Sequence, residues 1–210
     1  MFIGKRPGSK RGKKKGKVDI VAKNGIVILT VCLVLLSGCA TTPKHYAAES
    51  LGLGYVKRVV ILPFENNTEI KYAGQRFSDV VTTEILSRGL FEVVEKGETR
   101  RFLREELVQK EQETLDQATA LRLGQELNVQ AYLAGAVEDF SAVQNGSYSY
   151  PVIAATLRLV DVKTGQIIWQ TSGSESGYRT FDRLFGFASK DVNQVSFQLA
   201  QKLLSTLSAE

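Results

Sequence analysis

The sequence predicts a fold on the border between the α/β and α+β classes, with a single mixed β-sheet of about five strands and helices packed against it. Two observations lead to this prediction. Segments rich in β-branched residues recur along the chain, and segments with apolar residues at helical spacing separate or follow them. The expected order is strand, helix, strand, two helices, three strands and a closing helix, which is typical of helices covering a mixed sheet.

The first part of this pattern alternates strand and helix. Residues 56–64 form a β-branched run closed by Pro63, which predicts a buried strand that runs into a turn. Residues 71–88 then carry apolar side chains at helical spacing, and Gly89 follows as a stop signal. A short strand is expected over 91–95. Strand, helix and strand in this order suggest a parallel pair crossed by a helix.

Two further helices are expected next. Residues 98–109 predict a charged surface helix with a few apolar residues on its inner side. Thr114, with Gln117 three positions later, fits a capping box that opens another helix over 115–127. The side chains expected to be buried from this second helix are Ala118, Leu121 and Leu127.

The last part predicts three strands and a closing helix. Asn145-Gly146 marks a turn, and Lys163-Thr164-Gly165 is a compact hairpin connection. Apolar residues at helical spacing predict an amphipathic helix over 192–207. The three strands are expected over 129–140, 150–162 and 166–175.

The chain begins with the pattern of a secretory signal, which is basic, then apolar, then small residues at a cleavage point. Nine basic residues and one acidic residue precede an uncharged apolar run over 26–36. A helix needs roughly 20 residues to cross a bilayer, so this run of 11 residues is too short. A transmembrane anchor is the weaker alternative.

The apolar run ends in Leu36-Ser37-Gly38-Cys39, which resembles the lipobox of bacterial lipoproteins. In that group the cysteine is lipidated and the preceding segment is removed. Ala40 follows the cysteine, where many bacteria have an aspartate that retains the protein in the inner membrane. The resemblance therefore implies a protein anchored by its lipid in the outer membrane and facing the periplasm. The alternative is that Cys39 is an ordinary small residue at a segment boundary.

The lipobox divides the chain into three parts. Residues 1–38 are expected to be a lipoprotein signal peptide, 39–55 the lipidated cysteine and a short tether, and 56–210 the folded domain. The net charge of the whole chain is +5, but the remainder after residue 38 has 18 basic and 21 acidic residues. The basic character thus belongs to the signal, and we expect no nucleic-acid partner.

The sequence contains no nucleophile motif, metal-ligand cluster or phosphate-binding loop. His45, the only histidine, lies in the tether without other ligand-type residues around it, so we interpret it as a solvated loop residue. We therefore expect no cofactor, no metal, no small-molecule substrate and no enzymatic activity. An envelope enzyme is the alternative of another class, and a mechanism that depends on histidine would have to use His45.

One stretch, over 177–188, predicts an interaction surface. Aromatic and arginine side chains anchor many protein interfaces, and this stretch between the last strand and the last helix is rich in both. The alternative is that the aromatic side chains cover the sheet edge or start the closing helix. The candidate interface residues are Tyr178, Arg179, Phe181, Arg183, Phe185 and Phe187.

Three segments, RVVILPFENNT (58–68), ALRLGQELNVQAYLAGAVEDF (120–140) and LRLVDVKTGQIIWQ (157–170), resemble the family of CsgG-like lipoproteins. That family includes the curli secretion subunit CsgG and the penicillin-binding-protein activator LpoB, and its fold is similar to the amino-terminal domain of TolB. The resemblance implies a CsgG-like domain over 56–210, with a scaffold role for the shared residues. These are Leu121, Gly124, Leu127 and Gly135 for packing, and Asp161 and Gly165 for the hairpin.

The resemblance implies a non-catalytic assembly factor of the cell envelope, in surface assembly, secretion or cell-wall synthesis. Its partners would be the membrane, through the lipid, and another envelope protein or further copies of the chain. LpoB-like proteins carry a long linker, whereas the 16 steps from Cys39 to Tyr55 span at most about 55 Å. The domain is therefore expected to work close to its membrane.

The alternative function is a subunit of a CsgG-type oligomeric secretion channel in the outer membrane. Such a subunit must supply membrane-spanning hairpins, each of at least about 20 residues. The connections expected over 140–150 and 176–190 have 11 and 15 residues. Neither is long enough by itself, unless the flanking strands extend into the membrane.

Overall fold

The computed structural model describes Met1, Gly4 and residues 43–47, 53–106, 115–146, 148–178 and 188–208. The chain divides into two compact units, Met1–Thr41 and Thr42–Glu210, and all helices and strands named here lie in the second. In the described residues, no helix is both long and apolar enough to cross a membrane. The elements are β1 (Lys44–Ala47), η1 (Leu53–Tyr55), β2 (Arg58–Ile61), β3 (Glu65–Asn66), α2 (Ala73–Arg88), β4 (Glu92–Val93), α3 (Lys96–Glu105), α4 (Gln117–Glu126), β5 (Ala131–Asn145), β6 (Tyr148–Asp161), β7 (Ile167–Ser176), α6 (Val192–Leu204) and η2 (Ser205–Ser208).

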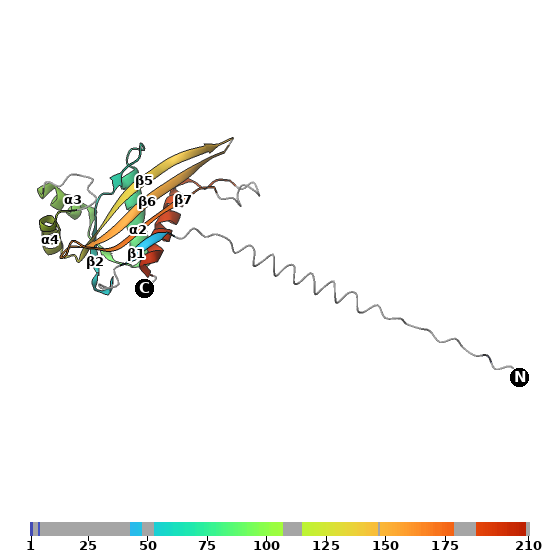
Figure 1. The fold of residues 1–210 in the computed structure, drawn as a ribbon, viewed down its shortest axis with the longest axis horizontal. Coiled ribbons are helices and arrows are strands. Elements are labelled where there is room, and N and C mark those ends of the chain that lie inside the picture. The colour runs from blue at the N-terminus through green and yellow to red at the C-terminus, as the bar shows by residue number, and fades with distance from the viewer. Residues whose placement is uncertain are drawn as a thin grey trace. The chain divides into compact units, whose positions relative to one another are not determined.

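A single mixed sheet organises the second unit, as the sequence predicted. Seven strands are present in the described residues, in the order β1-β7-β6-β5-β2-β4, with β3 beside β5 (Figure 1). The pairs of β2 with β4 and β5 are parallel, and the series β5, β6, β7 and β1 is antiparallel. The five predicted strands are β2, β4, β5, β6 and β7. The short strands β1 and β3 add to them.

Helices cover the two faces of the sheet in different places. Successive residues of a strand point to opposite faces, so Val59 and Leu133 join a core with α2 and α6, while Val60 and Tyr132 join a second core with α3 and α4. Figure 1 shows α3 and α4 gathered at the end of the sheet where β2 lies. Trp169, fully buried in the first core, donates a hydrogen bond from Nε1 to Thr206 Oγ1 at 3.0 Å.

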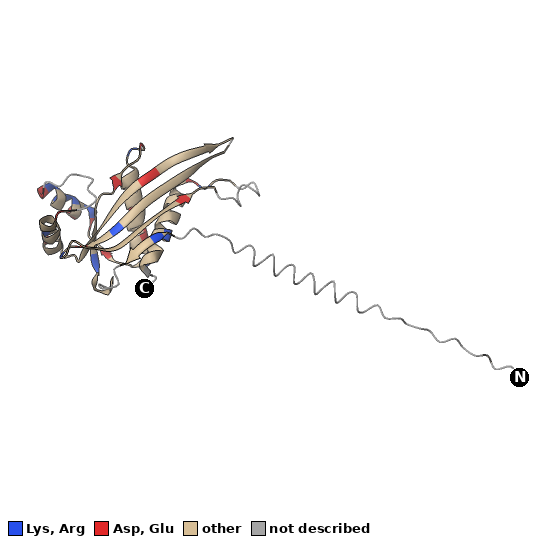
Figure 2. Ribbon diagram, in the orientation of Figure 1, with Lys and Arg blue, Asp and Glu red and all other residues tan. Residues whose placement is uncertain are grey.

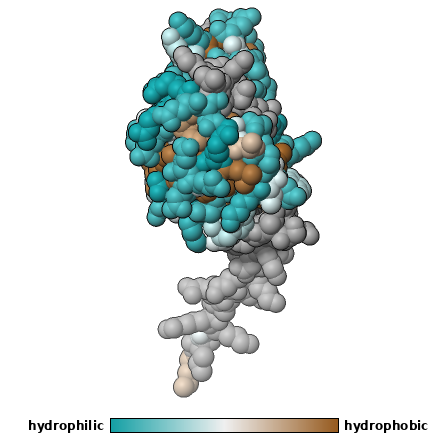
Figure 3. Space-filling view, turned by 90° about the vertical axis from the view of Figure 1, so that its left-hand side faces the viewer, coloured by the Kyte–Doolittle hydropathy of each residue, from teal (hydrophilic) through white to brown (hydrophobic). Residues whose placement is uncertain are grey.

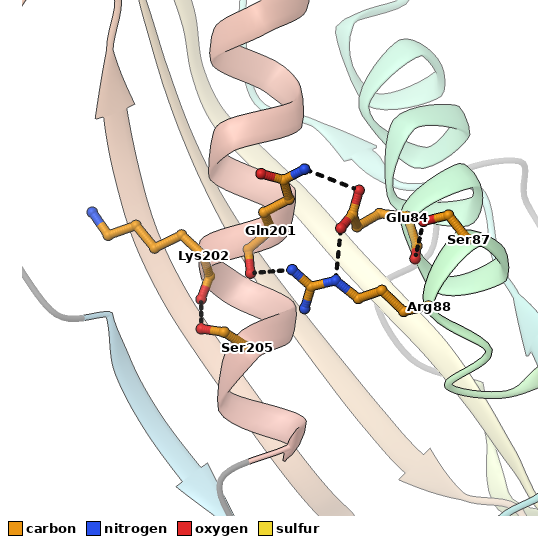
Figure 4. Close-up of polar contacts among 6 residues, drawn as sticks. All are labelled: Glu84, Ser87, Arg88, Gln201, Lys202 and Ser205. Atoms are coloured by element: carbon orange, nitrogen blue, oxygen red, sulfur yellow. Dashed lines mark hydrogen bonds and ion pairs between the residues drawn. The ribbon is translucent and has the colours of Figure 1, made fainter.

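A polar link joins α2 to α6 beside the first core (Figure 4). Arg88 Nε donates to Glu84 Oε1 at 2.7 Å, and Gln201 Nε2 donates to Glu84 Oε2 at 3.4 Å. Arg88 Nη2 reaches the main-chain oxygen of Gln201 at 3.3 Å. The buried carboxylate of Glu84 therefore has partners on both helices.

The structure corrects the predicted tether. Residues 44–47 form β1, which pairs antiparallel with β7 from Lys44↔Ser172 to Ala47↔Trp169. His45 is exposed, as predicted, but it lies in a strand and not in a loop. The composition of this short segment gave no period-2 pattern, because its strand residues are almost all exposed.

Helix α4 also differs from its prediction. Its N-cap is Asp116, whose carboxylate accepts hydrogen bonds from the main-chain nitrogens of Ala118 and Thr119, both at 3.1 Å. Thr114, the predicted cap, lies outside the described residues. The buried positions are Thr119, Ala120 and Leu123, whereas Ala118 and Leu121 are exposed, contrary to the prediction. Leu127 is partly buried and packs against the second core, in keeping with its predicted inward position.

The scaffold roles implied for two glycines and for the hairpin agree with the packing. A Cβ on Gly124 would lie 2.6 Å from Val162 Cγ2, and one on Gly135 would lie 3.0 Å from Leu157 and from the ring of Phe64. Gly165 has a φ of 69°, which favours glycine. These glycines allow close contacts and a tight turn at which other residues would be strained.

Candidate interaction surface

The β5–β6 hairpin extends beyond the rest of the sheet (Figure 1). Strands β5 and β6 have 15 and 14 residues, and β7 pairs with β6 only as far as Val152↔Ser176. We call residues 142–145 and 148–151, which pair with each other from Ala142↔Pro151 to Asn145↔Tyr148, the distal hairpin. Gly146 closes it with a φ of 63°.

This geometry corrects the predicted connection over 140–150. Strand β5 continues through it to Asn145, and β6 already begins at Tyr148. The number of residues in that connection therefore does not measure the length of the hairpin. The secretion-channel alternative depends on the length of this hairpin, and it stays a prediction.

Three tyrosines form a cluster on the distal hairpin. The ring centroid of Tyr178 lies 5.4 Å from that of Tyr148 and 5.4 Å from that of Tyr150, with interplanar angles of 23° and 29°. Tyr148 and Tyr150 are two positions apart on one strand, so their side chains share a face. Tyr148 is 54% exposed. Stacked aromatic rings on an exposed ribbon offer a large, rigid contact area.

The chain on either side of residues 179–187 is fixed to this hairpin. Gly177 N donates to Pro151 O at 2.8 Å, and Lys190 N donates to Gly177 O at 2.9 Å. Ser189 Oγ donates to Ser149 O at 3.2 Å. A Cβ on Gly177 would lie 2.7 Å from Pro151 Cδ and 2.9 Å from Lys190 O, so this meeting point requires glycine. Residues 178 and 188 therefore both lie beside the distal part of β6.

Only part of the predicted interface can be placed. Tyr178 lies in the tyrosine cluster. Tyr148 and Tyr150 are members that sequence reasoning missed, although the Tyr-Ser-Tyr alternation after an Asn-Gly turn was a usable signal. The other predicted residues lie outside the described residues: Arg179, Phe181, Arg183, Phe185 and Phe187 of the interface, and Leu36, Ser37, Gly38 and Cys39 of the lipobox.

The surface carries little charge. Residues 141–152 include no charged side chain, and Figure 2 shows the hairpin end of β5 and β6 without red or blue. No group of three potential metal-binding side chains occurs in the described part of the chain. An uncharged aromatic surface is suited to protein contact.

Comparison with known proteins places the fold in a family. The model of the family described as "Peptidoglycan-synthase activator LpoB" matches residues 44–174, from the start of β1 into β7. None of the curated proteins compared with the sequence matches it.

Two solved structures share the fold. The PelC dodecamer from Paraburkholderia phytofirmans has a TM-score of 0.56 and 21% identity, over 80% of this chain and 98% of that chain. The lipoprotein GNA1162 from Neisseria meningitidis has a TM-score of 0.53 and 13% identity, over 73% of this chain and 99% of that chain. At these identities the likeness concerns the fold alone. The match to the family model is what assigns the chain, because it spans well over half of its length: the chain belongs to the family of the peptidoglycan-synthase activator LpoB.

Proposed function

We propose that this chain is a lipid-anchored, non-catalytic factor of the cell envelope that binds a peptidoglycan synthase through the distal hairpin and the adjoining segment 179–187. Membership of a family described as a peptidoglycan-synthase activator supports the partner class. The lipobox-like Leu36-Ser37-Gly38-Cys39 supports an anchor in the outer membrane, with the domain in the periplasm.

The tyrosine cluster is the observation that carries this proposal. It brings Tyr148, Tyr150 and Tyr178 together beside the two residues, 178 and 188, that flank the segment 179–187, whose sequence is rich in aromatic and arginine residues. Aromatic and arginine side chains at the centre of a surface are the usual anchors of protein interfaces. One partner could therefore contact the exposed hairpin and this segment together.

The pairing of β1 supports a short reach from the membrane. Lys44 is five steps from Cys39, a distance of at most about 18 Å, whereas the 16 steps to Tyr55 span up to about 55 Å. While β1 stays paired with β7, the lipid would hold the domain close to the membrane surface. A partner that lies close to the membrane surface fits this arrangement.

Photocrosslinking in living cells tests the proposal. A photoreactive phenylalanine analogue at Tyr148 should crosslink to a peptidoglycan synthase, and one at Tyr46 should not. Tyr46 is a matched control, because its exposure of 57% is close to the 54% of Tyr148 and it lies on β1. Equal crosslinking from both positions, or none from Tyr148, would reject the hairpin as the partner site.

Self-association is a second candidate, because PelC, a chain of similar fold, forms a dodecamer. Light scattering of the full chain in mild detergent measures the mass directly. A mass of several chains, with Tyr148 crosslinked to a second copy, would favour self-association. A monomer crosslinked to a synthase would favour the activator function.

A further inference from the structure

A second candidate binding surface lies at the other end of the domain, between α2 and α3. A groove of about 760 Å³ opens there over the carboxyl ends of the parallel strands β2 and β4. In open α/β sheets, the carboxyl ends of parallel strands are the usual edge for binding sites. The face of the domain that carries α3 and α4 shows apolar residues between hydrophilic ones (Figure 3).

The floor of the groove is apolar and belongs to the two cores. It is lined by Ile61 at the end of β2, Phe64 between β2 and β3, Val94 after β4 and Leu103 from α3. Along the α2 wall, Tyr72 and Leu86 are 58% and 55% exposed. They are 14 positions apart, which is about 21 Å along a helix. The groove is therefore long enough for several residues of a peptide.

The α3 wall presents positive charge. Arg100 and Arg104 line the groove one helical turn apart, so their side chains share a face of α3. Neither has an ion-pair or side-chain hydrogen-bond partner among the described residues. By contrast, the neighbouring Lys96 is paired with Asp79 across the groove, and the carboxylate of Glu95 caps α3. The lining therefore holds three basic and two acidic side chains, a net charge of +1, and its two guanidinium groups are free to pair with a ligand.

The backbone at Tyr72 gives an independent indication of a ligand. Tyr72 precedes α2 with a φ of 66°, a left-handed conformation that costs energy for a residue with a bulky side chain. Glycine or asparagine would fit this position with less strain. Its ring is 58% exposed at the groove, and its described ring contact is with Lys71 Nζ, 4.8 Å from the ring centroid. Strained backbone conformations cluster at ligand-binding sites, so the exposed ring of Tyr72 is a candidate contact for a ligand in the groove.

We propose that the groove between α2 and α3 binds a peptide segment of a partner protein that presents apolar side chains beside carboxylates. The apolar side chains enter the floor between Tyr72 and Leu86, and the carboxylates pair with Arg100 and Arg104. Guanidinium groups bind carboxylates in a bidentate manner, and an apolar groove with basic residues on its rim recognises amphipathic acidic peptides. This site is separate from the distal hairpin and does not depend on its function.

Binding of designed peptides tests the proposal. Three sets of fluorescein-labelled 14-residue peptides carry leucine or phenylalanine at every third or fourth position. The remaining positions alternate alanine with one polar residue, which is glutamate in the first set, lysine in the second and glutamine in the third. Fluorescence anisotropy with the full chain in lipid nanodiscs, corrected for empty nanodiscs, should show the tightest binding for the glutamate set. Preference for the lysine or glutamine set would overturn the proposal.

Charge reversal separates the groove from the rest of the surface. Arg100→Glu with Arg104→Glu should weaken binding of the glutamate set about tenfold. The control pair, Arg101→Glu with Lys57→Glu, changes the net charge equally at exposed residues that do not line the groove. Its affinity for the glutamate set should stay within about twofold of that of the parent chain. An equal loss in both pairs would mean non-specific attraction and would overturn the proposal.

Tyr72→Gly adds a test that misfolding cannot mimic. Relief of the left-handed strain should leave the chain at least as stable in urea, while loss of the ring weakens binding several-fold. Unchanged binding would exclude Tyr72 and the groove beside it. Binding of dodecanoate, with none of the three peptide sets, would assign the groove to an acyl chain instead. In every variant, crosslinking from Tyr148 should persist, so failure here is distinguishable from failure of the activator function.

Discussion

Tyr55 donates a hydrogen bond from its hydroxyl to Asp161 Oδ2 at 2.7 Å, across 106 positions of sequence. The same carboxylate accepts, at Oδ1, the main-chain nitrogens of Lys163 and Thr164 at 3.0 and 2.7 Å. Thr164 Oγ1 is also 2.9 Å away. Asp161 therefore shapes the β6–β7 turn and fixes η1, the turn through which the chain enters β2.

Tyr55→Phe removes this bond alone. We expect the free energy of unfolding to fall by about 1 kcal/mol, because Asp161 keeps its three other donors. Urea unfolding followed by circular dichroism measures the change. Tyr46→Phe is the matched control, since Tyr46 is exposed and its hydroxyl has no hydrogen bond to the described residues. Equal stability of the two variants would mean that the bond contributes nothing.

The carboxyl of Asp161 should make stability depend on pH. Burial disfavours its charged form, but hydrogen bonds from Tyr55, Thr164 and Lys163 outweigh this and hold its pKa below the usual value. A lowered pKa in the folded state means a contribution that is present above the unfolded value, near pH 4, and lost as the pH falls through the folded value. Asp161→Asn should therefore be less stable than the parent chain at pH 7, with a gap that narrows below about pH 4. Urea unfolding at pH 7 and pH 3 measures it, and a constant gap would contradict the assignment.

The pKa of Tyr55 is shifted in the opposite direction to that of Asp161. Its burial, and then the hydrogen bond to Asp161 and the charge of that carboxylate, raise the pKa of the phenol. A raised pKa means that the contribution is complete below the unfolded value, near pH 10, and is lost only as the pH rises further. The contact between the two side chains is thus intact throughout the neutral range.

Long, periodic elements could be predicted from the sequence, and so could the hairpin at Asp161. Helix α2 buries Phe77, Val81 and Ile85, in keeping with the spacing in the sequence. Strand β1 could not be found in this way, because an edge strand with exposed side chains carries no hydrophobic period. In α4 the small residue Ala120 and the hydroxyl of Thr119 are buried in preference to Leu121. There the tight fit of Gly124 against Val162 sets the inner face.

The candidate interface could also be predicted only in part from the sequence, but for a different reason. Aromatic content predicted an interaction surface over residues 177–188, and of these Tyr178 stacks against Tyr148 and Tyr150 of the distal hairpin. Its stacking partners are 28 and 30 positions earlier in the chain, so only the strand register brings them together. Composition identifies the residue types, and the register decides which of them meet.

Gly74→Ala should strongly destabilise the fold. A Cβ at this position of α2 would lie 2.5 Å from the main-chain oxygen of Phe64 and 3.1 Å from that of Glu65. Main-chain atoms cannot rotate away, so the helix must shift, at a cost of about 2 kcal/mol or more. Gly54→Ala is the control, because nothing lies within 4 Å of its Cβ position. Thermal and urea unfolding of both variants test this, and an equal effect of the two would show that α2 can move freely.

The polar link between α2 and α6 should stabilise the fold mainly through the carboxylate of Glu84. Glu84→Ala removes the acceptor of Arg88 and of Gln201, and leaves a partly buried guanidinium without its carboxylate. We expect a loss of about 2 kcal/mol in the free energy of unfolding, because hydrogen bonds to charged groups are the stronger kind.

A double-mutant cycle distinguishes this tertiary contact from the helix propensity of α2. Gln201→Ala removes only the side-chain amide, since Arg88 contacts the main-chain oxygen of Gln201. The coupling energy between Glu84→Ala and Gln201→Ala should be about 0.5–1 kcal/mol. Gln75→Ala, on the exposed side of α2, should show no coupling with Gln201→Ala. A coupling near zero for Glu84 as well would mean that the two helices are held by their apolar contacts alone, with Val81 and Ile85 packed in the same core as Leu199 and Leu203.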